Sequence, residues 1–202
     1  MQKILAALFA VFLYAGSLQA YEIRFEEAAM ADGQAIPHDY GSIPGLIDVS
    51  YTAFGYTDPF FSFSLNFRSS GFSGQPGAYT ENSSAVAYIF LNPEPGYRVR
   101  LNSFFLGALG DEVRATSYLV NDDATWPTVD IFSGPITIGP DGLWVYPGWT
   151  SAEEIEIGFG PTAFSVGINY INFDILPVPE PAAWALLLAG LLTVIAGRRH
   201  AA

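Results

Sequence analysis

The chain has 202 residues and is strongly acidic, with 20 Asp and Glu against 8 Lys and Arg and a net charge of −12. So negative a protein repels nucleic acid and anionic lipid surfaces, which excludes nucleic-acid binding as its function. Because the chain contains no cysteine, a disulfide framework, a thiol nucleophile and a cysteine-based metal site are also excluded, and packing alone must stabilise the fold.

The N-terminal residues predict export. Lys3 precedes an uncharged apolar run over residues 4–13, and Leu18-Gln19-Ala20 supplies small residues of the kind that signal peptidase requires. We therefore predict a secretory signal peptide over residues 1–20, cut after Ala20. Without it and residues 182–202, all 20 acidic residues but only five basic ones are left, a net charge of −15.

Residues 21–176 are predicted to form one domain, an all-β, two-sheet antiparallel sandwich of the jelly-roll type. Helical periodicity is nearly absent, and short alternating apolar runs are separated by Gly, Pro, Asn and Asp. The clearest strand is residues 61–67, where alternate Phe and Leu side chains predict one core-facing side. The Ser- and Gly-rich residues 68–81 are predicted to be a long loop. Further strands are expected over residues 21–25, 45–54, 85–91, 98–106, 113–121, 129–132, 134–138, 143–146, 153–159, 163–168 and 170–176.

A catalytic group is not evident in this domain. His38 is its one histidine, and no serine lies in a Gly-x-Ser-x-Gly motif. Carboxylate doublets occur at residues 26–27, 111–112, 122–123 and 153–154, but adjacent residues of a strand point to opposite faces and do not form acid–base pairs. We therefore predict that the protein is not an enzyme.

The first and last strands indicate a calcium site. A jelly roll commonly brings these two strands side by side, and carboxylate oxygens are ligands that Ca²⁺ prefers. Glu26 or Glu27, at the end of the first strand, is therefore expected to meet Asp174 in the last strand. The alternative is that these carboxylates merely face water.

Aromatic residues gather between residues 126 and 149. Trp126, Tyr146 and Trp149 lie beside Pro or Gly in predicted loop apices, where a flat ring can stack on the apolar face of a sugar. The alternative is that Trp126 and Trp149 fill the core. Trp144 lies inside the predicted strand over residues 143–146 and is expected to be a core residue.

The C-terminal residues 177–202 combine three features. Pro179-Glu180-Pro181 forms an extended, solvated tripeptide, because proline lacks a backbone donor and restricts the residue before it. The uncharged residues 182–197 predict a transmembrane helix of about 24 Å, short for a bilayer core of about 30 Å. The basic end, residues 198–200, carries Arg198 and Arg199, which predict a cytoplasmic location for this terminus.

This order of motif, helix and basic end resembles the PEP-CTERM sorting signal of Gram-negative bacteria. The resemblance implies that Pro179, Glu180 and Pro181 are recognised by an exosortase, a membrane-embedded cysteine transpeptidase that cuts near the motif. It also implies a precursor anchored in the inner membrane that later reaches the cell surface or the extracellular space. The same tripeptide around Glu94 is followed by no apolar run and is predicted to be a turn.

A second resemblance concerns the domain itself. Residues 98–107, 113–121 and 166–173 are similar to strands of secreted jelly rolls that resemble carbohydrate-binding modules. The sequence therefore favours an exported, non-enzymatic protein of the surface, extracellular matrix or biofilm. The alternatives are a carbohydrate-binding module acting on extracellular polysaccharide and, less favoured, a secreted glycan hydrolase.

Overall fold

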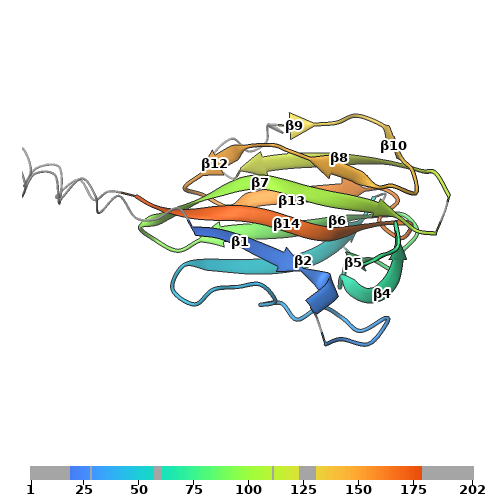
Figure 1. Ribbon diagram of the computed structural model, residues 1–202, viewed down its shortest axis with the longest axis horizontal. Coiled ribbons are helices and arrows are strands. Elements are labelled where there is room, and N and C mark those ends of the chain that lie inside the picture. Colours follow the sequence, from blue (N-terminus) through green and yellow to red (C-terminus); the bar gives the residue numbers. More distant parts are fainter. Residues whose placement is uncertain (1–18, 28, 57–60, 111, 123–130, 179–202) are drawn as a thin grey trace, which may run out of the picture.

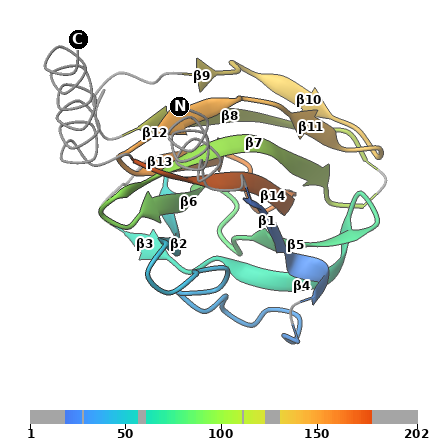
Figure 2. The ribbon, with the colours of Figure 1, turned by 60° about the vertical axis from the view of Figure 1, so that its left-hand side comes forward.

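The computed structural model describes residues 19–27, 29–56, 61–110, 112–122 and 131–178. In this part of the chain, two antiparallel sheets of seven strands each pack face to face (Figures 1 and 2). The predicted all-β, two-sheet antiparallel sandwich is therefore confirmed. No helix among the described residues is long and apolar enough to cross a membrane. The predicted signal peptide up to residue 18 and the sorting signal from residue 179 onward lie outside them.

We call the two sheets A and B. Sheet A has the order β11-β7-β14-β5-β4, with β1 paired to β14 and β12 paired to β7. Its strands are β1 (Gln19–Arg24), β4 (Asn66–Phe72), β5 (Gln75–Tyr79), β7 (Tyr97–Ala108), β11 (Leu143–Val145), β12 (Trp149–Ser151) and β14 (Val166–Pro177). Sheet B has the order β10-β8-β13-β6-β2-β3, with β9 paired to β8. Its strands are β2 (Ile47–Gly55), β3 (Ser62–Phe63), β6 (Ala85–Pro93), β8 (Arg114–Asp122), β9 (Ile131–Phe132), β10 (Ile136–Ile138) and β13 (Ile155–Gly160).

The connectivity of these strands is that of a jelly roll. The chain alternates between the sheets from β5 to β8, so that β5-β14-β7-β11 lies against β6-β13-β8-β10. The first and last strands lie side by side as predicted, with Gln19 opposite Ile175 and Arg24 opposite Tyr170. As a result, β1 begins at the same end of the sandwich at which β14 ends (Figure 1).

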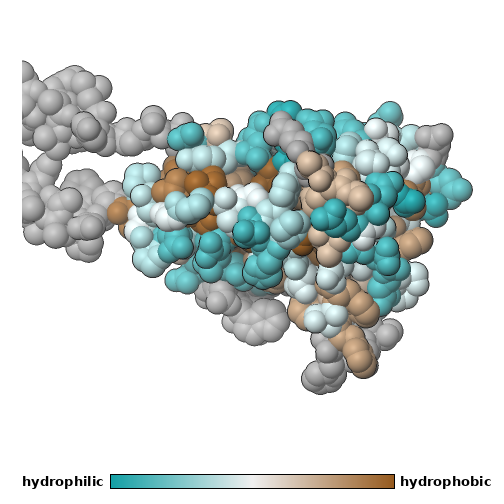
Figure 3. All heavy atoms as spheres, turned by 90° about the horizontal axis from the view of Figure 1, so that it is seen from below, coloured by the Kyte–Doolittle hydropathy of each residue, from teal (hydrophilic) through white to brown (hydrophobic). Residues whose placement is uncertain are grey.

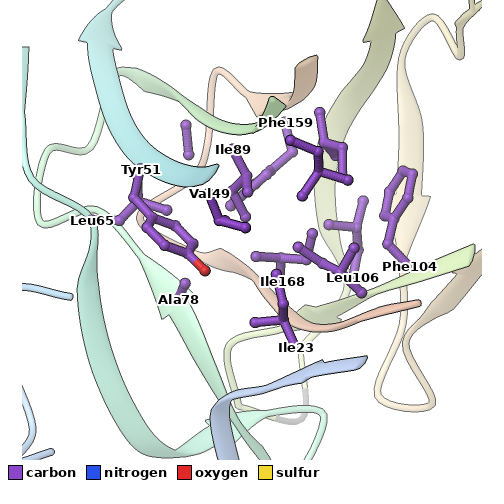
Figure 4. Packing of buried hydrophobic residues seen from close by; sticks show 14 of the residues in the cluster. Ile23, Val49, Tyr51, Leu65, Ala78, Ile89, Phe104, Leu106, Phe159 and Ile168 are labelled. Carbon is purple, nitrogen blue, oxygen red and sulfur yellow. The ribbon is translucent and has the colours of Figure 1, made fainter. Parts of the chain in front are cut away.

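Apolar side chains that alternate along the strands fill the space between the sheets. Ile89 and Phe159 of sheet B face Leu106 and Ile168 of sheet A, and all four are at most 1% exposed (Figure 4). Burial of one such side chain contributes roughly 1.5–3 kcal/mol. This packed core stabilises the fold without any disulfide. By contrast, the surface seen from below is mostly hydrophilic, with smaller hydrophobic areas (Figure 3).

The prediction of one strand over residues 61–67 is wrong. The chain passes from β3 in sheet B to β4 in sheet A within this segment, so its alternation does not belong to one face. Leu65 and Phe67 are buried, but Phe61 is 63% exposed and Phe63 is 37% exposed.

The prediction of a loop over residues 68–81 is also wrong. This segment forms the antiparallel β4–β5 hairpin, in which Arg68 lies opposite Gly77 and Phe72 lies opposite Gln75. The turn needs Ser73 and Gly74 at positive φ angles of 51° and 76°. The Ser and Gly content that predicted a loop therefore reflects the tip of the β4–β5 hairpin. The turn predicted around Glu94 is confirmed, because Tyr97 donates a backbone hydrogen bond to the Glu94 carbonyl.

Candidate functional site

A β-bulge in β14 turns two adjacent side chains to the outer face of sheet A, the face directed away from sheet B. The pairing of β14 with β7 shifts register between Ile168 and Tyr170, which leaves Asn169 as the extra residue. Ile168 and Ile171 remain in the core. Because strand residues otherwise alternate between faces, this bulge lets Asn169 and Tyr170 lie together on the outer face.

The bulge forms the floor of a groove of about 320 Å³. At this point β5 and β1 follow one another along the same edge of β14, with Ala78 opposite Ile168 and Arg24 opposite Tyr170. The groove is lined by Arg24, Glu26, Gln75, Pro76, Trp144, Asn169 and Tyr170. Its volume is at the lower end of the roughly 300–1,000 Å³ that is typical of small-ligand sites.

Exposed aromatic rings continue from this groove along the outer face. Trp144 is 47% exposed and packs on Phe105 and edge-on against Tyr170, with ring centroids 5.1 and 5.3 Å away. Tyr146 is 72% exposed and stacks against Trp144 at 6.2 Å. We call Trp144, Tyr146 and Tyr170 the aromatic platform.

The prediction that Trp144 fills the core is wrong. Its neighbours Leu143 and Val145 point inward, so Trp144 between them points outward from the edge strand β11. Of the predicted sugar-stacking residues, Tyr146 lies on the platform. Trp149 lies in β12 opposite Leu101, is partly buried and packs against the core. Trp126 lies outside the described residues.

A network of charged and polar groups fixes one side of the groove. Arg24 binds the Glu22 carboxylate through Nε, at 2.6 Å, and through Nη2, and it donates from Nη1 to Glu26 Oε1 at 3.0 Å. The Tyr170 hydroxyl donates to Glu22 Oε1 at 2.5 Å, and the Arg24 guanidinium lies 5.4 Å from the centre of the Tyr170 ring. Asn172 Nδ2 donates to the Tyr170 hydroxyl at 3.4 Å. The hydrogen bonds from Tyr170 and then Arg24 lower the pKa of Glu22, so this carboxyl is ionised at neutral pH.

The β4–β5 hairpin forms the opposite wall of the groove, and its position depends on two glycines beneath Phe72. Gly167 and Gly107 are paired across β14 and β7. A Cβ at Gly107 would lie 2.7 Å from the Phe72 carbonyl group, and one at Gly167 would lie 2.8 Å from the Phe72 ring. Phe72 is fully buried in the space that these missing side chains leave. The hairpin therefore folds over the outer face of sheet A instead of extending into solvent.

Hydrogen bonds then hold this wall in place. Asn169 Nδ2 donates to the Phe72 carbonyl at 3.2 Å and to the Pro76 carbonyl at 2.6 Å. Ser73 donates from its backbone N–H to the Ala108 carbonyl at 2.7 Å. The floor residue Asn169 thus positions the wall residues Gln75 and Pro76.

The structure does not bring the predicted calcium ligands together. Asp174 lies opposite Ala20, whereas Glu26 lies beyond Arg24, whose partner is Tyr170. Tyr170 and Asp174 are four positions apart along the strand, a distance of about 13 Å. Glu26 is bonded to Arg24, and the side chain of Glu27 is not described. Within the described residues no group of three His, Asp or Glu side chains converges in a way that could hold a metal ion.

A second, larger groove of about 580 Å³ lies on the outer face of sheet B. Phe54, Tyr88, Leu119 and Phe132 contribute to its largely apolar lining, and none of the described residues that line it is charged. Three of its hydroxyl groups are used internally, since those of Thr116 and Ser117 donate to the Gly160 carbonyl and that of Thr162 donates to the Ala115 carbonyl. Its described lining lacks charged groups of the kind that the sheet A groove presents.

No family model matches the chain, and no curated protein matches its sequence. Among solved structures, a CBM4 structure is similar at 15% identity and a TM-score of 0.36, over 72% of this chain and 95% of that one. The C-terminal CBM6 of LamC, a marine laminarinase from Zobellia galactanivorans, matches at 11% identity and a TM-score of 0.33, over 62% and 99% of the two chains. The family 11 carbohydrate-binding module from Clostridium thermocellum, in complex with a β-1,3-1,4-mixed-linked tetrasaccharide, matches at 10% identity and a TM-score of 0.30, over 75% and 99%. Because these TM-scores are below 0.5, the overlaps identify no relative, and the groove itself is the basis for a function.

Sequence reasoning missed most of this site, including Arg24, Trp144, Asn169 and Tyr170. For Trp144 a signal was present, because Leu143 and Val145 alternate with Trp144 and Tyr146 and so predict both rings on one face. For the other three no local signal existed. They meet through the bulge and through the pairing of β1 with β14, which join segments far apart in the sequence.

Proposed function

We propose that this chain is a non-catalytic protein that binds polysaccharide through the aromatic platform and the adjoining groove on sheet A. The observation that carries the proposal is the exposed Trp144 ring, which lies against Tyr170 and next to the charged groups that Arg24 holds. Sugars have apolar C–H faces that stack on aromatic rings, and their hydroxyls bond to fixed polar groups alongside. This groove offers both within one small volume.

The same network supports binding without hydrolysis. Glycoside hydrolysis uses two carboxyl groups about 5–10 Å apart, one of which must hold a proton with a raised pKa. Here Glu22 and Glu26 both bind Arg24, and the pKa of Glu22 is lowered by Tyr170 and Arg24. A general acid needs the opposite shift.

We propose in addition that the protein acts outside the cell. The support is the order of Pro179-Glu180-Pro181, the uncharged residues 182–197 and the basic residues 198–200. In this account the precursor is anchored in the inner membrane, an exosortase cuts near the tripeptide, and the domain is released to the cell surface or extracellular matrix. An extracellular domain of this kind meets matrix polysaccharide directly.

The test of polysaccharide binding is a Trp144→Ala variant assayed on a glycan panel. The purified wild-type protein should bind at least one polysaccharide, and Trp144→Ala should weaken that binding at least about tenfold, since truncating a central aromatic contact typically costs about 2 kcal/mol. Phe132→Ala is the matched control, because Phe132 is a 62% exposed aromatic residue on the other sheet. If Phe132→Ala abolished binding and Trp144→Ala did not, the sheet B groove would be the site.

A further inference from the structure

Among the described residues, the charged groups at the sheet A groove are the Glu22 and Glu26 carboxylates and the Arg24 guanidinium. Arg24 uses Nε and Nη2 on Glu22 and Nη1 on Glu26. Its guanidinium is thus already committed to two anions, and its pKa is raised by these bonds, first by that to Glu22. The groove therefore carries a net negative charge and has no unpaired cation.

No other basic side chain compensates for this charge at the groove. Of the five basic residues in the described part of the chain, only Arg24 lines it. Arg100 points to solvent from β7 opposite Asp174, five residues from Phe105, which is about 16 Å along the strand. Arg68 lies over the Tyr79 ring, and Arg114 pairs with Glu112. The strongly acidic chain as a whole adds to the negative potential.

We infer that the groove selects neutral sugars and rejects uronic acids and other anionic sugars, an inference that rests on the proposed polysaccharide binding. Hydroxyls of a neutral sugar donate to the Glu26 and Glu22 carboxylates in charge-assisted hydrogen bonds, while its ring stacks on Trp144. A sugar carboxylate at the same position would face Glu26 without a free cation to pair with, and like charges at short range are repelled. Arg24 positions the two acceptors and does not bind a sugar carboxylate.

The test compares neutral glucans, mannans and galactans with oxidised forms of the same polysaccharides. In each oxidised form, the C6 hydroxymethyl group has been converted to a carboxylate. The wild-type protein should bind the preferred neutral polysaccharide at least about tenfold more tightly than its oxidised form at about 0.01 M salt. The difference should shrink at about 1 M salt, because the Debye length falls from about 30 Å to about 3 Å.

A Glu26→Gln variant then removes the excess negative charge at the groove. Glu26 is half-exposed and its ion pair with Arg24 contributes little to stability, so the variant should fold. It removes one of the two anions that bind Arg24, so the variant should bind the oxidised polysaccharide at least about fivefold more tightly than the wild type does. Glu153→Gln is the control: Glu153 is exposed in the turn after β12, where Ser151 lies opposite Val99, and this change should leave the preference unaltered.

The outcomes separate this inference from the function on which it rests. If the wild-type protein bound the oxidised forms as tightly as the neutral ones, and Trp144→Ala abolished both, the binding site would stand and the selection of neutral sugars would be wrong. The selection would also be wrong if Glu26→Gln and Glu153→Gln changed the preference equally. If no polysaccharide of either kind bound, the proposed function itself would be refuted.

Discussion

Replacing Phe72 with alanine should destabilise the protein by about 3–5 kcal/mol, the usual cost of removing a fully buried aromatic side chain. Phe72 is 0% exposed and fills the space above Gly107 and Gly167. Its loss leaves a cavity between the β4–β5 hairpin and sheet A, so Gln75 and Pro76 should no longer form the groove wall. Chemical denaturation should show the lower stability, and the glycan assay should show weaker binding.

A Gly107→Ala variant tests the same contact from the other side. Its Cβ would lie 2.7 Å from the backbone carbonyl group of Phe72, which cannot move without shifting the hairpin. Overpacking of this kind typically costs about 1–3 kcal/mol. Phe61→Ala is the control, since Phe61 is 63% exposed and should change stability by no more than about 0.5 kcal/mol. Equal effects of Phe72→Ala and Phe61→Ala would show that the hairpin does not depend on this contact.

Replacing Glu180 with alanine should trap the full-length protein in the inner membrane. The apolar residues 182–197 would still insert, but the exosortase would no longer recognise the tripeptide. Deleting residues 182–202 should instead release an unanchored domain into the periplasm. The matched control is Glu94→Ala, which changes the same tripeptide in the turn between β6 and β7 and should leave processing unchanged.

The mass of the protein recovered outside the cell shows whether this tail is a removable sorting signal or a permanent membrane anchor. A sorting signal predicts a species that lacks residues 182–202. Recovery of a species that retains them would show that the tail is a permanent anchor. The binding function would be unaffected by that result, because β14 ends before the tail, at Pro177.

Much of the fold follows from local alternation in the sequence. Strand β13 shows apolar side chains at alternate positions and β6 is a nearly continuous apolar run; both are central in sheet B, and the sequence predicts them to within about two residues. The pairing of the first and last strands was also predicted correctly. Local alternation failed over residues 61–67 because it cannot show that the chain changes sheets between β3 and β4.

The candidate site was less predictable because it depends on register. A one-residue bulge at Asn169 decides that Tyr170 faces outward, and only this register places Tyr170 beside Arg24 and Trp144. The prediction that Glu26 meets Asp174 is wrong for the same reason. The two strands do lie side by side, but the register puts Asp174 opposite Ala20, away from Glu26.

Binding on sheet A is tested most directly by a two-dimensional ¹H–¹⁵N NMR titration of the protein with the tightest-binding neutral oligosaccharide from the panel. If polysaccharide binds on sheet A, the largest shifts should appear at the Trp144 indole N–H, the Arg24 side-chain N–H and the Asn169 amide, which border one groove. The Trp149 indole, in β12 opposite Leu101, should move little. Shifts concentrated at Tyr88, Gly158 and Phe132 in the sheet B groove, with Trp144 unchanged, would contradict the account.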